Sequence, residues 1–152
     1  MHNDVFRCGD IIFCTGKNNI MSKLIKFFTK SNYTHCAIVL DNKHLYHINY
    51  NQPANITHII YPKEEYEVYR PKDKFNHDKF HDFISSNIGN KYDLIEILEI
   101  IFNKDKKDKS YNYICSSLIY EAFKYSGLEL CDKSYALTPF DLIKSGKLRR
   151  IK

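Results

Sequence analysis

The sequence lacks long apolar runs and an export signal, and each absence removes a class of protein. No apolar segment approaches the roughly 20 residues needed to cross a bilayer as a helix. The start, Met1-His2-Asn3-Asp4, has neither the basic nor the apolar region of a signal peptide. From these two absences we expect a soluble, cytoplasmic protein. Tryptophan is also absent, whereas tyrosine occurs 12 times and phenylalanine 10 times.

Paired cysteines are missing as well. The five cysteines are an odd number and none shows C-x-x-C spacing, which argues against a disulfide framework or a zinc ribbon. A reducing compartment is the natural inference. The cysteines are Cys8, Cys14, Cys36, Cys115 and Cys131.

The charge excess is modest. A formal net charge of +5 is typical of a solvated surface, and the lysines of segment 103–109 alternate with acids, so we expect no nucleic-acid partner. Hydrophobic residues make up 43% and charged residues 27% of 152 residues, as in an ordinary globular protein. Without an internal repeat or a boundary, residues 1–152 are predicted to form a single domain.

The order of predicted elements is a small sheet followed by helices. Strand-forming residues between turn signals predict strands over 10–14, 34–40, 44–49, 55–61 and 65–70, with a last edge strand over 148–151. Helical spacing of apolar residues predicts helices over 19–30, 75–88, 92–102, 115–123 (with Gly127 as its C-terminal stop) and 138–142. This order predicts an α+β fold with an antiparallel sheet packed against helices.

The predicted helix over 19–30 is basic and amphipathic. Its apolar side chains fall on one face, while Lys23, Lys26 and Lys30 lie off that face. Such a face usually packs on a sheet. The alternative is a peripheral contact of residues 20–30 with membrane lipids or with an acidic substrate.

Cys115 opens a predicted amphipathic helix. A thiol in the first turn lies near the positive end of the helix dipole, which favours the thiolate. Acyl transfer through cysteine also needs a base and a group that orients that base. A lone cysteine is more often a core residue, and we interpret Cys14 and Cys36 in that way.

Two histidines in predicted strands are candidates for the other roles. If 41–43 is a three-residue loop, Ala37 faces His47 and His35 faces Asn49, so the two histidines are diagonal neighbours on one face. A two-residue loop would place them on opposite faces. A strand histidine can equally be a structural residue with satisfied hydrogen bonds.

The other histidines and the carboxylates suggest less. His77 and His81 have the spacing of two metal ligands on a helix, but no third ligand is apparent, so no metal site is predicted. The carboxylates show no pair that suggests glycosidase chemistry. Neither a metal nor an organic cofactor is required by the predicted chemistry.

Seven landmarks follow one another along most of the chain. They are Gly9-Asp10-Ile11-Ile12-Phe13, Thr34-His35-Cys36-Ala37-Ile38-Val39, His47, Val68-Tyr69-Arg70-Pro71, Gly89-Asn90-Lys91-Tyr92-Asp93, Cys115-Ser116-Ser117 and Thr138-Pro139-Phe140-Asp141-Leu142. In their order and spacing they resemble the circularly permuted papain-like superfamily related to NlpC-type hydrolases. Its YiiX-like and poxvirus papain-like proteins, and the lecithin:retinol acyltransferase group, place the histidine before the cysteine.

The resemblance implies a permuted papain-like domain with Cys115 as nucleophile, His35 as general base and acid, and His47 as the orienting group. A histidine at the orienting position, as His47 is here, is similar to the pattern of the acyltransferase relatives. Ile114 and Ser116-Ser117 depart from the acyltransferase motif N-C-E-H and favour the YiiX-like and poxvirus side.

The expected function is therefore that of a thiol hydrolase with a Cys-His-His triad, cleaving an amide or ester bond in a peptide or a lipid. The alternatives are a lipid acyltransferase or phospholipase of the same fold, and a non-catalytic binding module.

Overall fold

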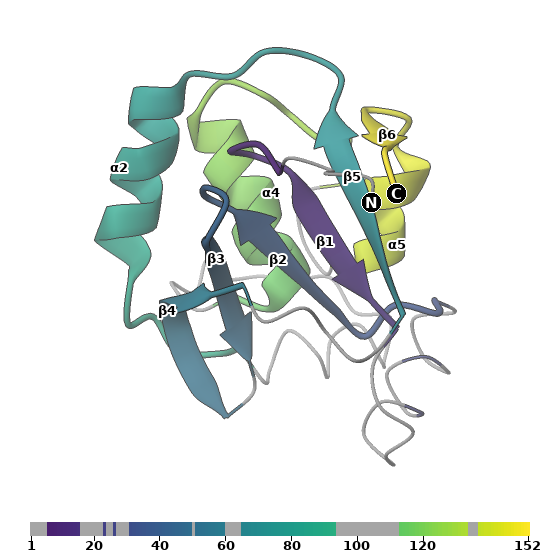
Figure 1. Cartoon of the computed structure of the whole chain (residues 1–152), viewed down its shortest axis with the longest axis horizontal. Coiled ribbons are helices and arrows are strands. Elements are labelled where there is room, and N and C mark those ends of the chain that lie inside the picture. The colour runs from purple at the N-terminus through teal and green to yellow at the C-terminus, as the bar shows by residue number, and fades with distance from the viewer. Residues whose placement is uncertain are drawn as a thin grey trace.

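A six-stranded antiparallel sheet forms the centre of the fold (Figure 1). The computed structural model describes residues 6–15, 23, 26, 31–49, 51–59, 65–93, 113–133 and 137–152. The strand order is β4-β3-β2-β1-β5-β6, and every neighbouring pair is antiparallel. The strands are β1 (Ile11–Cys14), β2 (His35–Val39), β3 (His44–Asn49), β4 (Gln52–His58), β5 (Tyr66–Pro71) and β6 (Leu148–Arg150).

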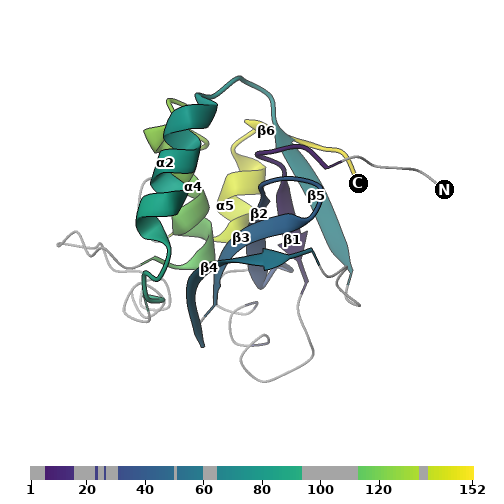
Figure 2. The same ribbon diagram turned by 60° about the vertical axis from the view of Figure 1, so that its left-hand side comes forward.

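Helices cover one face of this sheet (Figure 2). They are α2 (His77–Asn87), α4 (Cys115–Tyr125) and α5 (Pro139–Lys144). Helix α4 packs against β2 and β3 and also contacts α2 and α5, so it is the central helix of this layer. The predicted α+β class is confirmed, and so is the edge strand near the C-terminus.

The alternation of side chains along the strands separates two apolar clusters. The larger cluster lies between sheet and helices and includes Ile11, Phe13 and Ile38 from the strands and Leu118 and Phe123 from α4. The smaller cluster lies on the opposite face of the sheet. It consists of Ile12, Val39 and Val68, with partly buried hydrophobic residues packed around them.

Several boundaries differ from those predicted. The strand expected over 55–61 begins earlier, at Gln52, and also ends earlier, at His58. The helix expected over 75–88 spans His77–Asn87, because the side chain of Asn76 accepts a hydrogen bond from Lys79 N–H and caps it. Gly89, with φ +88°, follows its end as predicted.

Two predicted helices fall largely outside the described residues. In the helix predicted over 19–30, Lys23 and Lys26 are described and are helical. The helix predicted over 92–102 does not include Tyr92, which forms a parallel bridge with Tyr113; residues 94–102 and segment 103–109 lie outside the described part. Among the described helices, none combines the length and apolar character that a transmembrane span requires.

A tight turn precedes β1, and it is fixed by a hydrogen-bonded ion pair at Asp10 and by close packing at Gly9. Asp10 is fully buried and accepts two hydrogen bonds from Arg70, at 2.6 and 2.8 Å. Gly9 has φ +90°, and a Cβ atom there would lie 2.6 Å from the Phe75 ring. A side chain at this position would therefore be strained and would push Phe75 aside.

Candidate active site

Cys115 is the first residue of α4, and its side chain is 6% exposed. The residue before it, Ile114, has no side-chain oxygen that could cap the helix. First-turn N–H groups have no partner within their own helix, so a helix N-terminus favours an anion such as a thiolate beside it. The hydroxyl of Ser117 accepts a hydrogen bond from Ile114 N–H at 3.0 Å and fixes the entry of the chain.

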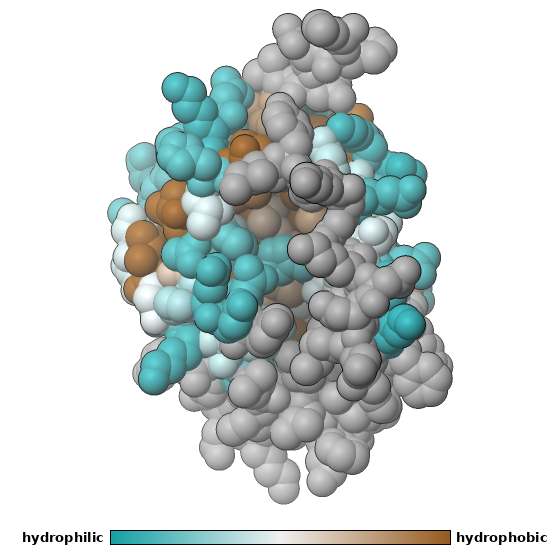
Figure 3. Space-filling model, turned by 60° about the horizontal axis from the view of Figure 1, so that its bottom comes forward, coloured by the Kyte–Doolittle hydropathy of each residue, from teal (hydrophilic) through white to brown (hydrophobic). Residues whose placement is uncertain are grey.

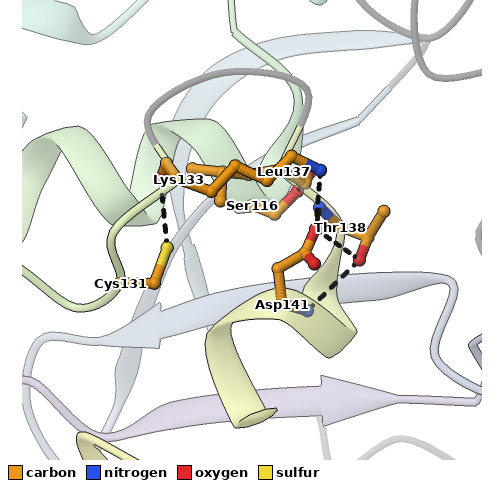
Figure 4. A network of polar contacts seen from close by, with 6 residues as sticks. All are labelled: Ser116, Cys131, Lys133, Leu137, Thr138 and Asp141. Atoms are coloured by element: carbon orange, nitrogen blue, oxygen red, sulfur yellow. Dashed lines mark hydrogen bonds and ion pairs between the residues drawn. The ribbon is translucent and has the colours of Figure 1, made fainter. Parts of the chain in front are cut away.

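The start of α4 is also tied to the segment before α5 (Figure 4). The buried hydroxyl of Ser116 donates a hydrogen bond to the carbonyl of Leu137. The next residue, Thr138, caps α5 by accepting from Asp141 N–H at 3.2 Å. The thiol of Cys131 donates to the carbonyl of Lys133 at 3.1 Å, so it takes part in this support and not in the Cys115 site.

The predicted three-residue loop and its register are observed. Ile38 pairs with Tyr46 and Val39 with Leu45, and Leu40 N–H donates to the His44 carbonyl at 2.9 Å. With this register the Nε2 atom of His35 lies 3.3 Å from the Nδ1 atom of His47. The two rings meet at an interplanar angle of 71° with centroids 5.5 Å apart.

The surroundings of His47 define which nitrogen carries its proton. The Asn49 amide nitrogen, a donor, lies 3.3 Å from His47 Nδ1, so Nδ1 accepts and Nε2 carries the proton. Nε2 then donates to the Thr57 hydroxyl at 3.1 Å. His35 must donate from Nε2 to the same Nδ1 acceptor, which leaves Nδ1 of His35 for Cys115.

His47 stays neutral near neutral pH. Burial disfavours its charged form and the neighbouring His35 adds to the effect, so the pKa of His47 is lowered from 6.5 to about 4. A neutral His47 orients His35 by accepting a hydrogen bond, as an amide would, without contributing a negative charge.

The pKa of Cys115 is lowered well below its usual value of 9.0. The largest cause is a hydrogen bond from the Cys36 thiol; burial opposes it, and a hydrogen bond to His35 with that ring's charge lowers the pKa further. The backbone N–H of Cys36 also contributes. Cys115 therefore has the environment of a reactive thiolate.

Other cysteines are shifted in the opposite direction. Burial is the largest cause of the raised pKa values of Cys8, Cys36 and Cys131. For Cys36 the hydrogen bond with Cys115 is the second cause. Of these four cysteines, Cys115 is the one whose surroundings favour the charged form.

The structure thus brings the three predicted site residues, Cys115, His35 and His47, into one chain of contacts. It adds partners that sequence reasoning missed. Cys36 is buried as predicted, but it also contacts the candidate nucleophile. The one sequence feature that could have indicated this contact is that Cys36 directly follows His35. No sequence feature indicates Asn49 or Thr57, because their roles depend on the β3–β4 pairing.

A second group of cysteine and histidine lies elsewhere. The ligand atoms of Cys8, His77 and His81 all lie within 4.8 Å of one another. Among the described residues this is the group of three such side chains close enough to share a metal ion.

No family model matches the sequence, and the comparison with curated proteins finds no significant relative. Among solved structures, the chain is similar to YiiX of Escherichia coli O157:H7, which is described as a metalloprotein. The TM-score is 0.68, and the match covers 96% of each chain at 18% sequence identity. The fold is YiiX-like. At this level of identity the likeness establishes the fold, and the YiiX-like resemblance read from the sequence is confirmed to that extent.

Proposed function

We propose that this YiiX-like chain is a cysteine-dependent hydrolase that cleaves an amide or ester bond through an acyl-enzyme, as permuted papain-like enzymes of the NlpC-related superfamily do. The observation that carries the proposal is the hydrogen-bonded series from Cys115 to His35 to His47, which begins at a helix N-terminus. Each member has the neighbour that its role requires.

In the first half-reaction Nδ1 of His35 takes the proton of the Cys115 thiol. The thiolate attacks the substrate carbonyl carbon, and the carbonyl electron pair moves onto oxygen. The N–H of Cys115 at the start of α4 is positioned to donate to that oxyanion. Collapse of the intermediate breaks the bond to the leaving group, which takes the proton from His35 and departs, leaving a thioester on Cys115.

In the second half-reaction water gives a proton to His35 as its oxygen attacks the thioester. The C–S bond breaks, the acid product leaves, and the Cys115 thiolate is again paired with protonated His35. His47 keeps Nε2 of His35 occupied throughout, so that Nδ1 is the nitrogen that exchanges protons. An acceptor alcohol or amine in place of water would make the same residues an acyltransferase.

The metalloprotein description of YiiX raises the question of a metal in this chain. The group that fits one, Cys8 with His77 and His81, contains none of the three proposed catalytic residues. A metal held there would supply a fixed positive charge and a cross-link, and the hydrolytic steps above use only this chain's Cys115, His35 and His47.

Labelling with a thiol-directed probe at neutral pH tests the proposal. We expect Cys115 to react faster than Cys131, whose pKa is raised by burial. Mass spectrometry of the labelled peptides measures both rates in one sample, and Cys115→Ala is the control for assignment. If Cys115 reacts no faster than Cys131, the thiol is not activated and a binding module is the better reading.

Substrate class is tested separately. With the end of the molecule that faces down in Figure 1 turned forward, hydrophobic residues are in view between hydrophilic ones (Figure 3). Peptide libraries and vesicles containing an acyl-donor phospholipid are incubated with the protein and with Cys115→Ala. Turnover of the phospholipid supports the lipid alternative, whereas vesicles that are neither bound nor consumed exclude it.

A further inference from the structure

We propose that Cys8, His77 and His81 bind a zinc ion that links the turn before β1 to the first two turns of α2. The three ligand atoms lie within 4.8 Å of one another. The sequence shows only the helical pair, because the third ligand comes from a residue 73 positions away from His81. The fold brings Cys8 next to His77 and His81.

The distance between sulfur and nitrogen fits a shared metal ion. Cys8 Sγ lies 3.7 Å from His81 Nε2. Zinc bonds of about 2.3 Å to sulfur and about 2.0 Å to nitrogen, at a tetrahedral angle, separate these two atoms by about 3.5 Å. A simple hydrogen bond would account for this one distance but not for a His77 nitrogen within 4.8 Å of both atoms.

The two histidines are placed by the helix and held by neighbouring rings. Residues four apart lie on the same side of a helix, which is the arrangement of paired zinc-binding histidines. The His77 ring stacks on Phe75, with centroids 4.4 Å apart and an interplanar angle of 29°. The His81 ring meets Phe80 edge-on at 5.9 Å. Asn76 caps this end of α2, so the backbone that carries both ligands is ordered.

The backbone of Cys8 is fixed as well. Asp10 N–H donates to the Arg7 carbonyl at 3.0 Å and closes the turn that contains Cys8. Gly9 N–H donates to the Val39 carbonyl at 2.9 Å and attaches that turn to the sheet. Because Gly9 lies against Phe75 with no room for a side chain, the turn approaches α2 closely enough for Cys8 to face the histidines.

The ligand set selects the metal. One thiolate and two imidazoles suit zinc, whereas magnesium and calcium prefer oxygen ligands. His77 and His81 are exposed and Cys8 is partly buried, so an ion can enter from solvent and water can complete the fourth position. On binding, the Cys8 thiol releases its proton to solvent and the sulfur binds as thiolate. The ion closes a long loop, which stabilises the folded chain.

Zinc binding is tested on the full chain carrying Cys115→Ser, so that the proposed nucleophile cannot bind the metal. The protein is stripped with a chelator, kept reduced, and titrated with Zn²⁺ in a calorimeter. We expect one ion per chain and a higher Tm when zinc is bound. Cys8→Ser, His77→Ala and His81→Ala should each weaken binding by at least about tenfold, because each removes a direct ligand.

Cobalt gives a readout that depends on the thiolate. Co²⁺ bound to the stripped chain should show a sulfur-to-cobalt charge-transfer band that disappears in Cys8→Ser. Cys131→Ser is the matched control, since Cys131 bonds to the Lys133 carbonyl and is not part of the group, and it should keep the band. Circular dichroism shows whether each variant is folded, and Cys8→Ala serves as the second variant if Cys8→Ser is not.

Two results would overturn the site. One is the absence of stoichiometric zinc binding by the stripped chain. The other is binding that Cys8→Ser or His81→Ala leaves unchanged. Because the chain tested already lacks the Cys115 thiol, either result would leave the proposed hydrolase untouched, and failed thiol labelling at Cys115 would leave the zinc site untouched.

Discussion

Two groups of cysteine and histidine lie at opposite ends of β1, and they differ in burial and in what surrounds the sulfur. Cys8 precedes the strand, whereas Cys14 at its end pairs with His35, the neighbour of Cys115. Cys115 is buried and receives hydrogen bonds, while the Cys8 group has two exposed histidines, each with a nitrogen within 4.8 Å of the Cys8 sulfur.

The same residue types are therefore directed to different chemistry by their partners. A buried sulfur with hydrogen-bond donors around it is stabilised as a free thiolate, as a nucleophile requires. A sulfur grouped with exposed imidazoles that have lone pairs to share offers the coordination a cation requires. Histidine substitutions at the two ends should therefore have separate effects.

The largest predicted effect comes from His35→Ala. Loss of a general base lowers the rate of the chemical step by about 10²- to 10⁴-fold, and labelling of Cys115 at neutral pH should fall in parallel. His81→Ala is the matched control at the other end and should leave labelling of Cys115 unchanged while it weakens zinc binding. Rates of probe incorporation measured on both variants check this. Equal losses in both would mean that the two groups are not independent.

Acid should destabilise the fold through His47. Because its pKa falls from 6.5 to about 4 in the folded protein, the unfolded chain takes up this proton first as the pH is lowered. Stability is therefore lost between these two pH values, by at most about 3 kcal/mol, and this term has no effect at higher pH. Urea unfolding at several pH values measures it.

The control for this effect is a pair of asparagine variants. In His47→Asn the contribution of His47 to the pH dependence of stability should vanish. His58→Asn replaces an exposed strand histidine and should leave the loss between pH 6.5 and 4 in place. If both variants have the pH profile of the unmodified chain, His47 does not titrate as proposed.

The orientation of His35 should depend on one atom of His47. An asparagine oxygen can occupy the place of Nδ1, the atom that contacts His35, whereas a glutamine oxygen reaches the place of Nε2. His47→Gln should therefore reduce turnover by about 10- to 100-fold, the worth of a hydrogen bond to a group that becomes charged. His47→Asn should retain more of the turnover than His47→Gln does. The reverse order in kcat would place the essential contact at Thr57 instead.

The sequence predicted the parts of the fold and site that depend on local pattern. A three-residue loop over 41–43 predicts that His35 and His47 share one face, a two-residue loop predicts opposite faces, and the observed register is that of the three-residue loop. The amphipathic pattern after Cys115 was enough to place it at a helix start. Both features follow from residues close in sequence, where spacing determines geometry.

Contacts between distant segments could not be predicted in the same way. Cys36 was interpreted as a core residue because nothing local shows that α4 begins against β2. Cys8 could not be assigned to His77 and His81, because its approach requires the Gly9 turn to pack on Phe75. In each case the missing information was tertiary packing.

Cys36 provides the smallest predicted effect. It also sharpens the comparison with Cys8, because the Cys115 sulfur has the Cys36 thiol beside it, whereas the Cys8 sulfur lies beside Nε2 of His81. The Cys36 thiol is a weak donor, so loss of its hydrogen bond in Cys36→Ala should cost about 1 kcal/mol and raise the pKa of Cys115. The midpoint of the rate of alkylation of Cys115 against pH should shift to higher pH, while the plateau at high pH is unchanged. Cys36→Ser keeps a donor at the same position and should preserve the lower midpoint. An unshifted curve in Cys36→Ala would leave His35 and the start of α4 as the main stabilisers of the thiolate.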